Sequence, residues 1–265
     1  MKASARERFF SRMAMIFVVL GMIGAHAADA VAQRTGYPNK PIRLVVPFAP
    51  GGGTDIMARV VAQTLAPSLR VPVIVDNRPG GGGIVGAETV VRATPDGYTL
   101  MFEAGNFATR AALYELPFDS IRDITPISSV FNSAFIICLH PAVPVKSVKE
   151  LIAYTTEHAG KVNYGSSGVG GFTHLATELY LSMTKTRMTH IPYKGTGPAL
   201  TDLVGGQIQV VWGSLASAVP HIKANRLRGI AATTATRWSG MPELPAVSET
   251  VPGYEAAVWY GLWGP

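Results

Sequence analysis

Residues 44–55 read LVVPFAPGGGTD, and this stretch decides the fold that we expect for the chain. Its apolar start is typical of a short buried strand, which the proline and the three glycines bring to an end. A helical pattern follows at once, because apolar side chains recur every four residues at Met57, Val61 and Leu65. The stretch therefore predicts a strand, a glycine loop and the start of a helix.

The junction between this strand and this helix is suited to an anion. We expect Thr54 or Asp55 to be the N-cap, because a side-chain oxygen there accepts a hydrogen bond from a first-turn N–H group. The remaining free N–H groups and the positive end of the helix dipole favour negative charge. Glycine lets the backbone approach a ligand closely. An ordinary tight turn is the other interpretation of this one loop.

Strand-like and helix-like segments alternate along the rest of the chain, which is typical of an α/β fold with mostly parallel sheets. The first series is predicted as strand 42–47, helix 55–66, strand 71–76, helix 84–92 and strand 98–102. The second follows strand 134–139 and has its own glycine loop at 165–171. Two such series predict two domains facing each other across a cleft, with a ligand at the strand ends.

The N-terminus has the pattern of a secretory signal peptide, which we place at residues 1–32. A basic segment precedes an apolar stretch that is too short to span a bilayer comfortably, and small-residue cleavage patterns follow. The mature chain is expected to be exported. Domain 1 is predicted at 37–134, with 231–265 returning to it, and domain 2 at 135–230. We expect the hinge where segments 132–136 and 228–233 cross.

Charge and motif content favour a binding protein over an enzyme. Residues 1–32 hold four basic and two acidic side chains, which leaves +4 of the formal +6 for the rest of the chain. Without a Lys/Arg cluster this is not a nucleic-acid footprint. The histidines lack metal-ligand spacing, and no nucleophile elbow occurs. We expect no metal and no cofactor, and we interpret the single cysteine, Cys138, as a buried hydrophobe.

One motif supports a different class of protein, an NAD-binding α/β enzyme. Residues 77–86 contain G-x-G-x-x-G at Gly81, Gly83 and Gly86, and Glu103 ends the next strand, where a ribose-binding acid would lie. Arg78-Pro79 before the glycines and export from the cytoplasm argue against it. The dinucleotide reading is therefore the less favoured alternative.

A series of short motifs then occurs in order along the chain. These are Tyr37-Pro38-x-Lys40-Pro41-Ile42-Arg43, Val45-Val46-Pro47-Phe48, Pro50-Gly51-Gly52-x-x-Asp55, Asn77-Arg78-Pro79-Gly80-x-Gly82-Gly83, Pro95-Asp96-Gly97-Tyr98-Thr99-Leu100, Leu116-Pro117-Phe118-Asp119, Ser147-Val148-x-Glu150-Leu151-Ile152, Pro192-Tyr193-Lys194-Gly195, Ala199-Leu200-x-Asp202-Leu203-x-Gly205-Gly206-Gln207 and Trp259-x-Gly261-Leu262. In combination, and over nearly all of residues 37–265, they resemble the periplasmic substrate-binding receptors of tripartite tricarboxylate transporters, the Bug-type receptors.

The resemblance implies a two-domain, type II-like Venus-flytrap fold that holds a small organic acid or a related amide in its interdomain cleft. The ligand carboxylate would lie between two loops, with Pro50, Gly51, Gly52, Thr54 and Asp55 facing Ser166, Ser167, Gly168, Gly170 and Thr173. Phe48, Glu103, Asn106 and Tyr193 complete the candidate ligand-binding residues. The resemblance implies the periplasm as the location of the chain and membrane subunits of a transporter as its partners, and the receptor is expected to be a monomer. A sensor receptor that feeds a signalling partner is the alternative.

Two features depart from the family pattern. The stretch after Leu100 usually has small and hydroxyl residues leading to Asn-Pro, and here it contains Glu103 and Arg110. Glu103 would disfavour a second ligand carboxylate and favour an amine, an amide or a neutral group, whereas Arg110 could offset it in the cleft or pair with it. The chain also ends at Pro265, where relatives continue, so we expect it to be C-terminally truncated.

Overall fold

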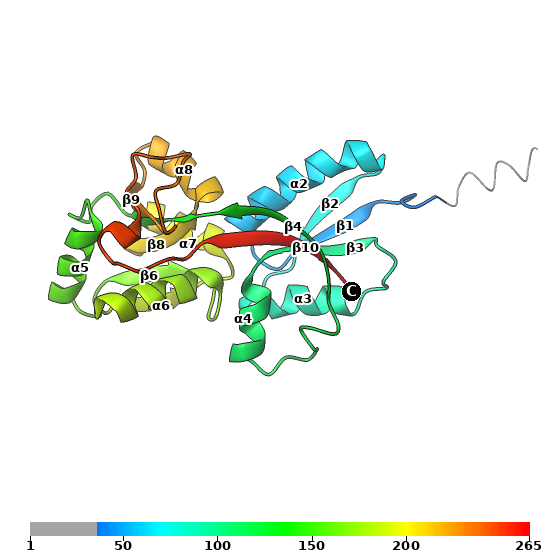
Figure 1. Cartoon of the computed structure of the whole chain (residues 1–265), viewed down its shortest axis with the longest axis horizontal. Helices are drawn as coiled ribbons and strands as arrows, with labels where there is room; N and C mark the ends of the chain where they lie inside the picture. Colours follow the sequence, from blue (N-terminus) through cyan, green and yellow to red (C-terminus); the bar gives the residue numbers. More distant parts are fainter. Residues whose placement is uncertain (1–35) are drawn as a thin grey trace, which may run out of the picture. The chain divides into compact units, whose positions relative to one another are not determined.

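The computed structural model describes residues 36–265, whose strands form two five-stranded sheets (Figure 1). The predicted signal peptide, residues 1–32, lies outside the described residues. The first sheet has the order β2-β1-β3-β10-β4 and contains β1 (Ile42–Val46), β2 (Val73–Asn77), β3 (Thr99–Ala104), β4 (Thr125–Ser133) and β10 (Val258–Gly264). The second has the order β7-β6-β8-β5-β9 and contains β5 (Phe135–Leu139), β6 (Asn163–Ser166), β7 (Thr189–Pro192), β8 (Val210–Ser214) and β9 (Arg228–Ala232).

Helices accompany each sheet. The first half of the molecule, as we call it, is the first sheet with α2 (Gly53–Leu69), η1 (Gly81–Gly83), α3 (Ile84–Val91) and α4 (Asn106–Leu113). The second half is the second sheet with α5 (Val148–Glu157), α6 (Phe172–Thr184), α7 (Thr196–Val204), α8 (Leu215–Lys223) and η2 (Val247–Glu249). Among residues 36–265, no helix combines the length and the hydropathy that crossing a membrane requires.

Each sheet is mostly parallel. In the first sheet β1 pairs in parallel with β2 and β3, and β10 runs antiparallel to both β3 and β4. The second sheet repeats this arrangement, with β6 parallel to β7 and β8, and β5 antiparallel to β8 and β9. One strand in each sheet therefore opposes the other four. The α/β class that the alternating pattern predicted is confirmed.

Apolar side chains on both faces of each sheet hold the helices. Strand β5 shows this alternation clearly, because Ile137 packs in one cluster with α5 and α6 while Ile136 and Cys138 pack in another with α7 and α8. In the first half, α2 buries Ala58 and Ala62, whereas Met57 and Val61 are only partly buried. Burial of this apolar area is the main stabilising contribution.

Two elements have no clear signal in the sequence, α4 and β4. Residues 125–133 contain three serines, and most of these side chains are exposed. They form a strand because β10 provides a backbone partner along the whole segment, from Thr125 to Ser133. Residues 125–133 therefore form a strand because they pair with a segment more than a hundred residues away, and not because their own sequence has a strand pattern.

The chain crosses from the first sheet to the second at Ala134, between β4 and β5. We expected it to return at residue 231, and this is wrong, because β9 stays in the second sheet as far as Ala232. Ala232 also bridges to Ala246. Only β10, from Val258 on, rejoins the first sheet.

Buried hydrogen bonds attach the segment after β9 to the second half. Tyr254 is fully buried, and its hydroxyl accepts from Trp212 Nε1 at 3.0 Å and donates to the Ala176 carbonyl at 3.0 Å. Thr233 joins this segment to the first crossing, since its hydroxyl accepts from Phe135 N at 3.0 Å and donates to the Ala256 carbonyl at 2.9 Å. Both crossings of the chain therefore meet at Thr233.

Replacing Tyr254 with Phe tests this attachment. The change leaves the buried Trp212 N–H without a partner, whereas the Ala176 carbonyl keeps its acceptor role inside α6, so we expect the free energy of unfolding to fall by about 1–3 kcal/mol. Chemical denaturation followed by circular dichroism measures it. Tyr154→Phe on α5, at a half-buried position, is the matched control and should change stability by less than about 0.5 kcal/mol. Equal stability of the two variants would contradict the role of this hydroxyl.

Candidate functional site

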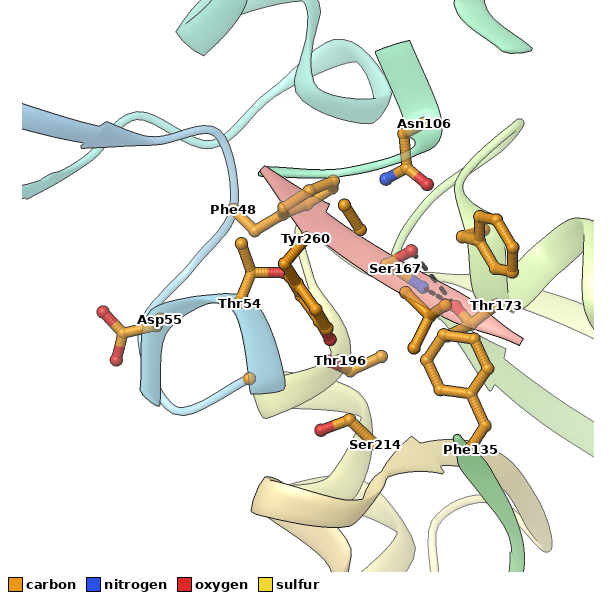
Figure 2. Close-up of a pocket in the computed structure, with 14 residues that line it drawn as sticks. Phe48, Thr54, Asp55, Asn106, Phe135, Ser167, Thr173, Thr196, Ser214 and Tyr260 are labelled. Carbon is orange, nitrogen blue, oxygen red and sulfur yellow. Dashed lines mark hydrogen bonds between the residues drawn. The ribbon is translucent and has the colours of Figure 1, made fainter. Parts of the chain in front are cut away.

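A pocket that encloses about 390 Å³, partly open to solvent, lies where strands of both sheets end. Phe48 follows β1, Ala104 ends β3, Ser167 follows β6 and Ser214 ends β8. The carboxyl ends of the parallel strands thus meet at one place, as the rule for open α/β sheets predicts. The lining residues, drawn in Figure 2, are Phe48, Gly52, Thr54, Asp55, Ala104, Asn106, Phe135, Ser167, Phe172, Thr173, Thr196, Ser214, Val258 and Tyr260.

Five helices of the described chain begin in the wall of this pocket. The first residues of α4, α6 and α7 and the N-caps of α2 and α8 all line it. Only α8 among these five has a side-chain cap, from Ser214, which accepts from Ser217 N. The other four begin at glycine N-caps without a side-chain hydrogen bond. Several positive helix ends and free N–H groups therefore surround the pocket.

No basic side chain is among the described residues that line the pocket, and Asp55 is the one charged residue there. Asp55 is paired with Arg59 outside the wall. Among residues 36–265, no group of three or more His, Cys, Asp or Glu side chains is placed to hold a metal ion. An anion in the pocket would therefore be held by backbone N–H groups and hydroxyls.

Asp55 fixes the first loop instead of facing the pocket centre. The helix begins at Gly53 with Gly52 as its N-cap, so the expected cap at Thr54 or Asp55 is wrong. Asp55 lies in the first turn and accepts hydrogen bonds from Gly51 N at 3.0 Å, from Asn77 Nδ2 at 3.0 Å and from Arg59. Its carboxylate points away from the other lining side chains in Figure 2.

These contacts keep the Asp55 carboxylate charged. Burial acts to raise its pKa, but the hydrogen bonds from Arg59, Gly51 and Asn77 outweigh it and lower the pKa below the usual value. A charged Asp55 completes the pair with Arg59 and holds the turn at Gly51, whose φ of +82° suits glycine. The loop is thus held in shape before any ligand arrives.

The second loop is held in the same way by its own hydroxyls. Thr173 accepts a hydrogen bond from Ser167 N at 2.8 Å and donates one to Ser167 Oγ at 3.1 Å. Both residues line the pocket and are almost fully buried. The dashed lines in Figure 2 mark this pair at the start of α6. The loop therefore presents ordered hydroxyl groups to the pocket.

Asn106, the first residue of α4, has a side chain that is only 2% exposed. Its Oδ1 is buried and has no hydrogen-bond partner among the described residues. Figure 2 shows the amide pointing into the pocket. A buried acceptor without a hydrogen bond lowers the stability of the fold. A ligand group that donates a hydrogen bond to Oδ1 would remove this cost.

Seven of the candidate residues do not line the pocket. Pro50 and Gly51 border a separate groove on the outer side of the first loop. Ser166 contacts His190 at 2.6 Å behind the second loop, and Tyr193 donates to Asp202 at 2.6 Å. The others that do not line it are Glu103, Gly168 and Gly170.

An ion pair with Arg110 keeps the Glu103 side chain out of the pocket lining. The two side chains form a buried bidentate ion pair, and Arg110 Nε also donates to the Gly82 carbonyl at 3.0 Å. Of the two roles left open for Arg110, pairing with Glu103 is therefore the one observed. Burial acts to raise the Glu103 pKa, whereas the charge and hydrogen bonds of Arg110 favour its ionised form. With both oxygens engaged by Arg110, Glu103 does not line the pocket.

The two halves touch on both sides of the pocket. On one side, Ala49 N donates to the Lys194 carbonyl at 2.8 Å, and a Cβ on Gly197 would collide with the Pro50 carbonyl oxygen. On the other side, the Tyr114 hydroxyl donates to the Val169 carbonyl at 2.9 Å. Glycine at 197 is thus required by close approach of the two backbones. These contacts close the walls around the pocket.

Sequence reasoning missed several lining residues. Thr196 and Ser214 stand at helix starts after strands β7 and β8, so the rule applied to the first loop would have found them. Tyr260 had no such signal, because it comes from β10 at the end of the chain and forms a hydrogen bond with Thr54. The remaining missed residues, Ala104, Phe135, Phe172 and Val258, provide apolar wall.

Two stacked histidines support the second loop from behind. The rings of His174 and His190 have centroids 4.2 Å apart, and His174 Nδ1 accepts a hydrogen bond from Gly170 N at 3.1 Å. Burial lowers the pKa of both, and the neighbouring His174 contributes to lowering that of His190 to about 4. Glu178, on α6 near both rings, opposes the shift. The second loop therefore packs against two histidines that are neutral at physiological pH.

This pair should make stability depend on pH. Because the unfolded histidine has a pKa near 6.5 and folded His190 about 4, the unfolded chain binds more protons between these values. Stability should be full above about pH 6.5 and fall as the pH drops towards 4. Free energies of unfolding at pH 7 and pH 5 measure it, and the loss should be smaller in His190→Gln. His158→Gln is the control; an equal loss in His190→Gln and the unmodified chain would contradict the assignment.

Comparison with known proteins connects this geometry to one family. The model of the tripartite tricarboxylate transporter family receptor matches residues 57–265. Protein BugT of Bordetella pertussis is 33% identical over 258 residues, which cover 96% of this chain and 79% of that relative.

Two solved structures of similar proteins contain carboxylates. That of R. palustris Rpa4515 with adipate has a TM-score of 0.84 and 35% identity, and the match covers 87% of this chain and 78% of that one. That of MatC from Rhodopseudomonas palustris with bound malate has a TM-score of 0.81 and 29% identity, covering 86% and 79%.

The matches to these relatives cover most of the chain. The relatives are substrate-binding receptors and not enzymes, which agrees with the absence of a catalytic motif from the sequence. The chain therefore belongs to the tripartite tricarboxylate transporter receptor family, the Bug-type receptors that its ordered motifs resemble.

Proposed function

We propose that this chain is a periplasmic receptor that binds a small carboxylate-containing metabolite in the pocket and delivers it to a tripartite tricarboxylate-type transporter. The observation that carries the proposal is the meeting of five helix N-termini around a pocket without a basic lining side chain. Such an arrangement suits a small anion whose oxygens accept backbone and hydroxyl hydrogen bonds. The adipate and malate complexes of the two relatives support the same ligand class.

The ligand would lie between the first and second loops. Gly52 and Thr54 approach from α2, and Ser167 and Thr173 approach from α6. Residues that belong to both halves then hold one ligand group, so binding favours the closed arrangement over an open one. In this proposal the halves move about the crossings at Ala134 and Thr233, and the transporter subunits recognise the closed monomer.

Binding measurements test the proposal. Calorimetry with the mature chain, from about residue 33, and a panel of mono- and dicarboxylates should give a micromolar or tighter dissociation constant for at least one carboxylate. A ligand at a hundredfold over its dissociation constant also adds roughly 2.7 kcal/mol to stability, which should raise Tm by several degrees. NAD is included in the panel, and stabilisation by NAD alone would contradict the receptor.

Gly197→Ala tests whether binding needs the two halves to close. The added methyl group meets the Pro50 carbonyl of the opposite half. We expect at least tenfold weaker binding of the same carboxylate, which is about 1.4 kcal/mol. Gly205→Ala, at the other end of α7, is the matched control, because a Cβ there lies 3.5 Å from Thr201 O, its nearest atom beyond the two flanking residues, which is an ordinary contact distance. Equal affinity of the two variants would mean that closure does not contribute to binding.

A further inference from the structure

The two ends of the pocket differ in what they offer a ligand. At one end the starts of α2, α7 and α8 lie together, since a Cβ on Gly52 would lie 2.8 Å from Thr196 Oγ1 and one on Gly53 would collide with Ser214. Figure 2 shows Thr196 and Ser214 on one side of the pocket and Asn106 on the opposite side. Three helix N-termini thus share the first end, and α4 begins at the second.

A carboxylate fits the first end better than the second. Three adjacent helix starts and the hydroxyls of Thr196 and Ser214 can share one negative charge there. At the Asn106 end, the N-terminus of α4 offsets only part of the cost of taking a second ionised carboxylate out of water. Arg110 cannot help, because Glu103 and the Gly82 carbonyl already engage its guanidinium.

The side chain of Asn106 determines which chemical group of a ligand the second end of the pocket can bind. Its Oδ1 is a buried acceptor without a partner, so it requires a donor. An ammonium group is a poor match, since no unpaired carboxylate of the lining faces it: Glu103 is bound to Arg110, and Asp55 is bound to Arg59. Turning the amide round would present its NH₂ to a carboxylate but would still leave that second charge without a cation.

We propose that Asn106 is a specificity-determining residue, which accepts a hydrogen bond from a neutral donor of the ligand. The ligand is then a small monocarboxylate with a carboxamide or hydroxyl at its other end, and dicarboxylates are weak competitors. This inference rests on the proposed function. It departs from the adipate and malate seen in the two related structures.

Matched ligands of equal length test the inference. Succinate, succinamate and γ-aminobutyrate share a four-carbon chain and end in a carboxylate, a carboxamide and an ammonium group; glutarate, glutaramate and δ-aminopentanoate repeat this with five carbons. Calorimetry should show the half-amide of one length binding at least tenfold tighter than its dicarboxylate and its amino acid. Equal or tighter binding of the dicarboxylate would overturn the inference and leave the receptor function standing. Failure of every carboxylate in the panel would instead overturn the receptor function.

Variants of Asn106 make the test residue-specific. Asn106→Leu keeps a similar volume without the acceptor, so the half-amide should lose at least tenfold in affinity while the dicarboxylate changes little. Asn106→Asp should shift the preference towards the amino acid of the same length. Asn132→Asp, at an exposed position on β4, adds the same charge away from the pocket and should alter neither preference. An unchanged ligand order in both Asn106 variants would show that this residue does not select the ligand.

Discussion

Negative charge in this pocket must be stabilised by the backbone, because no basic side chain lines it. The first N–H groups of a helix have no partner within the helix, so a site of this kind depends on several helices beginning at one place. That requirement explains why glycine loops and uncapped helix ends gather there. It also explains why Asp55 is turned outwards: its carboxylate would repel an anion, and it serves instead to hold Gly51 and Arg59.

The two halves can present these helix starts to one another because they exchange strands. Strand β5 follows β4 directly but belongs to the second sheet, and β10 follows the second half but belongs to the first. Each of them is the one strand that opposes its neighbours. Thr233 binds both crossing segments through one hydroxyl. The geometry of the pocket is therefore tied to a small region where the chain passes twice.

The candidate site could be predicted best where a loop follows a strand within one local pattern. Gly52, Thr54, Ser167 and Thr173 line the pocket, as the rule of glycine loops at helix starts indicated. Two other candidates, Ser166 and Tyr193, do not line the pocket because their hydroxyls form hydrogen bonds with His190 and Asp202. Glu103 does not line it either, because its partner, Arg110, comes from the following helix, which had no sequence signal.

The sequence by itself determined the alternation of strands and helices, the α/β class and the positions of the glycine loops at helix starts. These are local properties, set by apolar periodicity, by glycine and by the chemistry of helix starts. Only the tertiary structure decided that β4 is a strand, that residues 233–257 stay with the second half, and that Tyr260 and Asn106 share one pocket. Each of these depends on contacts between segments far apart in the chain, whose partners no local pattern specifies.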